Sequence, residues 1–131
     1  MKRIVEEINR IVRNELWFEF EIINYSKKSL EIRGGLDIFD INSPYEFSII
    51  FSDIFYLSSL ITWQTDTSKN FLRLIKGKEF LEINQKFKIE QGYLVFEFLV
   101  EDYEDNKFIV VAKKIEYTIP MGTASILNNQ I

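Results

Sequence analysis

The chain has 131 residues, which suits one domain large enough to bury a core. Its 47% hydrophobic share is ordinary for a globular domain, and its 15% aromatic share, mostly Phe, favours β-sheet. There is no Cys, which argues against a disulfide-stapled secreted domain. There is also no His, which excludes Ser-His-Asp and Cys-His catalysis and nearly every zinc, copper or iron site. The net charge of -4 argues mildly against a nucleic-acid partner.

Residues 2–14 are predicted to form an amphipathic helix. The aliphatic side chains recur at helical spacing and share one stripe, namely Ile4, Val5, Ile8, Ile11 and Val12. The polar residues, including Asn9, are assigned to the opposite side. Such a short, one-sided helix is unstable alone, so we expect it to pack on a sheet.

No apolar run in the sequence has the length of a signal peptide or a transmembrane helix, because charged residues interrupt every apolar stretch. We therefore expect a cytoplasmic protein with no membrane partner.

From residue 18 the hydrophobic period changes to two, which is typical of strands with one dry face. Residues 18–22 and 30–33 are predicted to form a hairpin, with a break or bulge at Gly34-Gly35. Residues 45–51 form the next predicted strand. Apolar extended chain follows over 54–63.

The second half begins with residues 64–70, a polar stretch predicted to be a mobile loop. Residues 71–75 and 80–83 flank Lys76-Gly77-Lys78 and favour a hairpin, with a helix over 68–75 as the alternative.

Two strands, over 94–100 and 107–119, follow in the prediction. In the second of these strands, the apolar residues change from one face to the other at Lys113-Lys114. This indicates a β-bulge or a strand that changes layers there.

Together these segments predict one α+β domain over residues 1–119 and a polar C-terminal tail over 120–131. The N-terminal helix would pack on a mainly antiparallel, curved sheet of about 7–8 strands, or on a partly open barrel or sandwich. An unclosed sheet has edges that can pair with those of a second copy, so a homodimer is one alternative.

Without His or Cys, any catalysis would have to rest on carboxylates, Lys, Tyr or Ser, and two groups of carboxylates are the candidates. The acidic hairpin 101–106 lacks EF-hand spacing, so a solvated turn is preferred to a calcium site. Asp37, Asp40 and Asp53 would serve a carboxylate-based hydrolase only if they converged, and each lies where a strand ends. We therefore predict no catalytic residue, no metal site and no cofactor.

Large amphipathic side chains are the candidate partner-binding residues, because Trp and Tyr anchor many interfaces. Trp63 borders the polar stretch that contains Asp66, and Tyr56 and Tyr93 complete the candidate set. The same rings, pointing inward, would be core. At the mouth of a barrel they would hold an apolar ligand, so a small-molecule or lipid-binding domain is the alternative function.

Residues 45–57, together with strands 96–100 and 108–117, resemble small stand-alone α+β proteins of bacteria, some of which are immunity proteins of polymorphic toxin systems. The resemblance lies in size and strand pattern and includes no diagnostic motif, so no functional residue is transferred. It implies a non-enzymatic protein that binds and blocks a toxin domain. A protein-interaction domain is thus the leading hypothesis.

Overall fold

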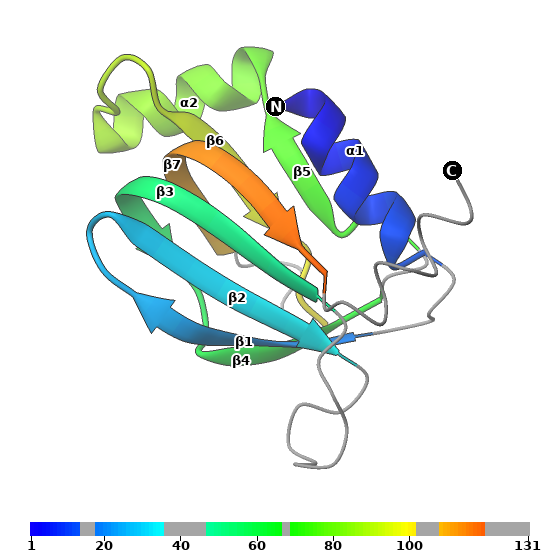
Figure 1. Cartoon of the computed structure of the whole chain (residues 1–131). Coiled ribbons are helices and arrows are strands. Elements are labelled where there is room, and N and C mark those ends of the chain that lie inside the picture. The colour runs from blue at the N-terminus through cyan, green and yellow to red at the C-terminus, as the bar shows by residue number, and fades with distance from the viewer. Residues whose placement is uncertain (14–17, 36–46, 67–68, 102–107, 120–131) are drawn as a thin grey trace.

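The computed structural model describes residues 1–13, 18–35, 47–66, 69–101 and 108–119. Two helices and one seven-stranded antiparallel sheet make up this part of the chain (Figure 1), which confirms the predicted α+β class. The elements in chain order are α1 (Lys2–Ile11), β1 (Phe18–Tyr25), β2 (Ser29–Gly35), β3 (Phe47–Ser58), β4 (Thr62–Thr65), β5 (Leu72–Ile75), α2 (Gly77–Phe87), β6 (Leu94–Phe98) and β7 (Phe108–Thr118). The predicted tail lies outside the described residues.

The strand order β4-β1-β2-β3-β7-β6-β5 forces the sheet to curl. Strands β4 and β5 are consecutive in the chain but lie at opposite edges of the sheet. The chain from Thr65 to Leu72 reaches about 25 Å at most. A flat sheet of these strands would be about 29 Å wide, so its edges must approach one another. At one end the segment that follows β6 reaches β4, where Glu101 N donates to Gln64 O at 2.9 Å.

The inside of the curl is filled by aromatic rings. The fully buried ring of Phe20 lies 5.2 Å from that of Phe71 and 5.9 Å from that of Trp63, between ring centroids. Helix α1 covers this interior beside β5 and β7, and its apolar stripe packs into it as predicted. Buried Val5, Ile8 and Val12 form the centre of that stripe.

Helix α2 packs on the outer face of the sheet, where it contacts the side chains of a second, smaller cluster. The prediction of a hairpin over 71–83 is therefore wrong in its second half, and the alternative helix over 68–75 is wrong as well. Phe80, Ile83 and Phe87 recur at helical spacing and pack on the sheet, which explains the helix. Gly77, at φ +62°, turns the chain out of β5.

The pairing of β1 with β2 corrects the bulge predicted at Gly34-Gly35. Gly34 and Gly35 pair in regular register with Phe20 and Glu19, so no bulge lies there. The irregularity in that hairpin is in β1, between Ile22 and Asn24.

The facing change predicted at Lys113-Lys114 is real, but β3 shares it. Ala112 and Ile115 both point into the core, and so do Phe51 and Ile54 on the neighbouring strand. The pairs Ser52–Lys114 and Ile54–Ala112 keep one register, and the register shift falls one step later, between Ile54 and Tyr56. Asp53, at φ +57°, adopts the left-handed conformation where β3 changes facing.

Candidate interaction surface

The β5 edge of the sheet is capped by α1. The side chain of Asn9 donates to Leu72 O at 2.8 Å and accepts from Leu72 N at 3.1 Å, as a neighbouring strand would. Asn9 is therefore buried, not on the polar side of the helix where the sequence pattern put it. This capping protects the backbone of one edge strand from pairing with another chain.

The end of β1, in contrast, is open on one side. Strand β4 covers β1 only as far as Glu21, and Ile22 N donates to Ile61 O at 2.9 Å. Beyond Ile22, the described residues pair with β1 from the β2 side alone. The side chains that flank this opening are large, apolar and exposed, at 43% for Ile23, 54% for Tyr25 and 67% for Ile61. We refer to these three residues as the β1 end.

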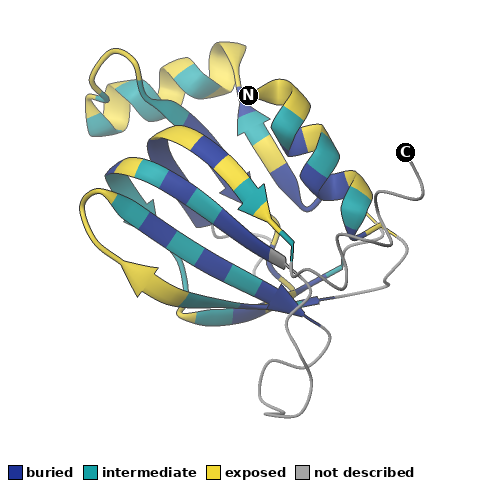
Figure 2. Cartoon of the chain, viewed as in Figure 1, coloured by how far each residue is buried: buried dark blue, intermediate teal, exposed yellow. Residues whose placement is uncertain are grey.

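A group of lysines lies next to the β1 end, where the β1–β2 turn meets the facing change of β3 and β7. Asp53 N and Ile54 N donate to the carbonyl oxygens of Lys28 and Lys27, both at 2.8 Å. On the other side of β3, Lys114 pairs with Ser52. Figure 2 shows exposed stretches of the turn, β3 and β7 lying side by side here. We call this group the lysine end, made of Lys27, Lys28, Asp53, Lys113 and Lys114.

Two of the candidate partner-binding residues meet in the cluster below α2. The ring of Tyr56 lies 4.4 Å from that of Phe87, and the ring of Tyr93 lies 5.2 Å from that of Phe55. Both tyrosines are half-buried, and Nζ of Lys113 is 5.3 Å from the Tyr93 ring centroid. Tyr93 thus links the cluster to the lysine end.

The other two candidates lie elsewhere. Trp63 is 5% exposed and stacks in the interior of the curl, so it offers no exposed ring to a partner. No acceptor among the described residues reaches its buried Nε1. Asp66, half-buried, lies 4.0 Å from Nζ of Lys69. Gln64 and Thr65 belong to β4, so the predicted loop over 64–70 begins as a strand.

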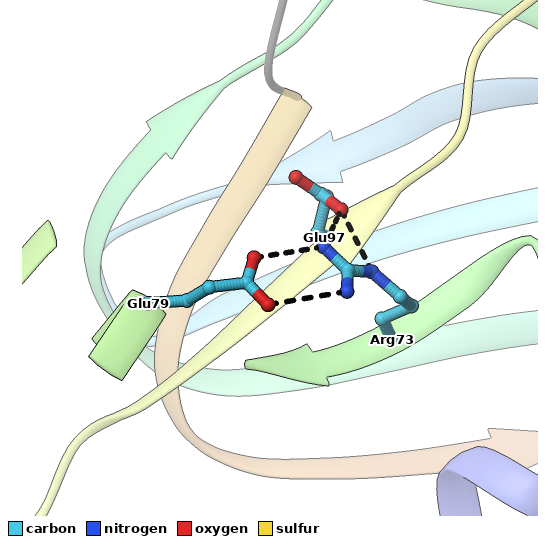
Figure 3. A network of polar contacts seen from close by, with 3 residues as sticks. All are labelled: Arg73, Glu79 and Glu97. Carbon is cyan, nitrogen blue, oxygen red and sulfur yellow. Dashed lines mark hydrogen bonds and ion pairs between the residues drawn. The ribbon is translucent and has the colours of Figure 1, made fainter. Parts of the chain in front are cut away.

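Arg73 of β5 joins two carboxylates on the outer face (Figure 3). Its Nε and Nη2 donate to Oε1 of Glu97 at 2.9 and 2.6 Å, and its Nη1 and Nη2 donate to Glu79 of α2 at 3.4 and 3.1 Å. The bonds to Glu97, then those to Glu79, hold the pKa of the Arg73 guanidinium above its ordinary value. This network connects α2 to β5 and β6.

Only some of the carboxylates considered for catalysis belong to the described residues. Asp37 and Asp40 lie outside the described residues, and so do residues 102–106 of the acidic hairpin. Asp53 is described, and it is an exposed residue at a backbone turn.

Among the described residues, no helix is both long enough and apolar enough to cross a membrane. Comparisons of the chain with known protein families, with curated proteins and with solved structures found no match.

Proposed function

We propose that this protein is a non-enzymatic binding domain that docks another protein at the β1 end. The observation that carries the proposal is the difference between the edge strand β5 and the end of β1. The backbone of β5 is capped by Asn9, whereas no described strand covers β1 beyond Ile22 on the side away from β2, where exposed Ile23 and Ile61 lie. An open strand edge beside apolar side chains is the usual site for an added strand.

A second copy of the chain fits this edge poorly. Antiparallel two-fold pairing centred on Asn24 would place Ser26 of each copy opposite Ile22 of the other. The backbone beside Ile22 is already bonded to Ile61, so little of β1 is left for a symmetric ladder. This geometry favours a different protein as the partner.

The alternative functions receive less support. The rings of Phe20, Trp63 and Phe71 occupy the interior of the curl, which favours a packed core over a cavity for a lipid. Glu97, the most buried described carboxylate, is paired with Arg73, as expected of a structural ion pair.

Together with the resemblance noted above, the open edge extends the proposal to an immunity protein that blocks a toxin domain. A toxin-like reading frame beside the gene, and a toxin domain neutralised on co-expression, would support this extension. A solitary gene would count against the immunity role but leave the docking proposal standing.

The docking proposal is tested by capturing the partner from the native host with the immobilised full chain. The identified partner is then re-expressed and its affinity measured by calorimetry. We expect Ile61→Lys to weaken binding about tenfold or more, because it places a charge on the apolar contact. The matched control is Leu81→Lys, since Leu81 of α2 is similarly exposed at 60% but lies away from β1.

Equal affinities for the wild type and Ile61→Lys would overturn docking at the β1 end. A protein that dimerises on its own, with Ile61→Lys restoring the monomer, would show instead that a second copy occupies this edge.

A further inference from the structure

The lysine end owes its charge to the facing change in β7. In a regular strand, adjacent residues point to opposite sides of the sheet, so one of Lys113 and Lys114 would point into the core. Because Ala112 and Ile115 both point inward, both lysines are exposed instead. The bend therefore brings two adjacent positive charges to the same surface.

Strand β3 changes facing at the same level, at Asp53. This brings a second pair of lysines, Lys27 and Lys28, close to the bend. Asp53 takes the left-handed conformation, which Asp tolerates better than most residues. Its N–H then bonds to the carbonyl of Lys28, and that of Ile54 bonds to Lys27. The β1–β2 turn is held against β3, with both of its lysines exposed.

The lysine end is a positive region on an acidic protein. It gathers four of the 16 basic residues around one aspartate, whereas the whole chain has a net charge of -4. Two residues further along the strands, the outer face turns acidic, because Glu31 and Glu116 flank Ile50. The positive charge is therefore confined to the bend.

This region is continuous with the β1 end. Tyr25 is the last residue of β1, and the turn with Lys27 and Lys28 follows it directly. A chain docked beside Tyr25 would therefore pass over the lysines.

We propose that the docked partner supplies an acidic protein segment that binds the lysine end. The inference rests on the proposed function and names the chemistry of the partner. Charge complementarity selects an acidic segment, since its carboxylates would meet four exposed lysines. An acidic protein chain is favoured over nucleic acid because the lysine end continues directly from the β1 end, where a strand of a partner protein would dock.

The test measures the fluorescence anisotropy of labelled probes with the full chain at low salt. The probes are a poly-glutamate peptide, a poly-lysine peptide of the same length and single-stranded oligo-dT. We expect the poly-glutamate peptide to bind best, with an affinity that falls as salt is added.

Two charge reversals locate the site, and each has a matched control. Lys27→Glu/Lys28→Glu and Lys113→Glu/Lys114→Glu are each expected to weaken poly-glutamate binding about tenfold. Lys76→Glu/Lys78→Glu changes the net charge equally at exposed positions beside α2, and it is expected to change affinity less than about threefold. Circular dichroism confirms that each variant is folded.

Equal losses in all three double variants would overturn the inference, because binding would then follow net charge alone. Tighter binding of oligo-dT than of poly-glutamate would also overturn it, in favour of a nucleic-acid surface. If the captured partner depends on Ile61 but not on the four lysines, the inference fails while the proposed function stands.

Discussion

Asn9 and Leu72 form a two-way hydrogen-bonded pair across 63 residues of sequence, in which one side-chain amide satisfies both backbone groups of an edge strand. Both residues are buried, so water cannot replace the amide. The pair links α1 to β5 and occupies the backbone groups of Leu72 that another strand would otherwise bond. Among the described residues, the strand backbone that stays free to pair is therefore that of the β1 end.

Asn9→Ala is expected to lower the free energy of unfolding by about 3 kcal/mol, because it leaves the N–H and C=O of Leu72 buried without partners. Urea unfolding followed by tryptophan fluorescence measures this loss. Glu6→Ala is the control, since Glu6 is exposed on the same helix, and it should change stability by less than about 0.5 kcal/mol. Equal effects of the two substitutions would contradict the role of Asn9.

Arg73→Met is expected to cost about 2 kcal/mol, because it leaves the buried carboxylate of Glu97 without its cation. The value is below that for a fully buried pair since the Arg73 side chain is 42% exposed. The double variant Arg73→Met/Glu97→Leu should recover most of the loss, which thermal unfolding would reveal.

The contribution of Glu79 to this network is expected to be small. Both partners in the Arg73–Glu79 ion pair are more than a third exposed, so Glu79→Gln should cost less than about 1 kcal/mol. A larger cost would mean that α2 depends on this contact and not on its apolar side chains.

We predict that Tyr117 makes the free energy of unfolding fall at alkaline pH. Burial, followed by the hydrogen bond from its hydroxyl to Oε2 of Glu7 at 3.1 Å, raises the pKa of the phenol. A folded pKa above the unfolded value of about 10 gives stability that is complete below pH ~10 and lost as pH rises through the folded pKa.

Tyr117→Phe should therefore reduce the loss of stability above pH ~10, as measured by urea unfolding across that range. Tyr25→Phe, at an exposed phenol, should leave the alkaline profile as in the wild type. Identical profiles for all three proteins would contradict the prediction.

Gly34→Ala is expected to destabilise the fold by about 2 kcal/mol through overpacking. A Cβ at this position would lie 2.7 Å from Cε1 and 3.0 Å from Cδ1 of Phe20, whose ring is held by Trp63 and Phe71. In the Phe20→Leu background, which lacks the ring atoms, the same substitution should cost less in a double-mutant cycle. Additive costs would show that the strain arises elsewhere.

Local patterns predicted the helix α1 and most strands, because each depends on the spacing of apolar residues along a few turns or pleats. Helix α2 was missed for a related reason. Phe80 and Ile83 are too few to separate a helix from a short strand, and Phe87, which completes the stripe, lies beyond the predicted segment 80–83.

The candidate site was harder to predict, since exposure depends on what packs against a residue. Trp63 borders a polar stretch in the sequence, yet the pairing of β4 with β1 places it beside Phe20, and the curl of the sheet places it against Phe98. The lysine end as a whole has no signature in the sequence, because Lys28 and Lys113 are far apart in the chain and meet only through β3. The signal that was available is the shared facing change, visible in β3 as Ser52-Asp53 and in β7 as Lys113-Lys114.

The sequence by itself determined the α+β class, the apolar stripe of α1 and the antiparallel hairpins, because these follow from residue spacing within short segments. Only the tertiary structure decided which edge is capped and which is open. Asn9 is polar, so the helical pattern placed it outside, and only the approach of Leu72 makes burial of its amide favourable. Long-range pairing likewise exposed Ile61 and gathered the lysines, since both depend on strands distant in the sequence.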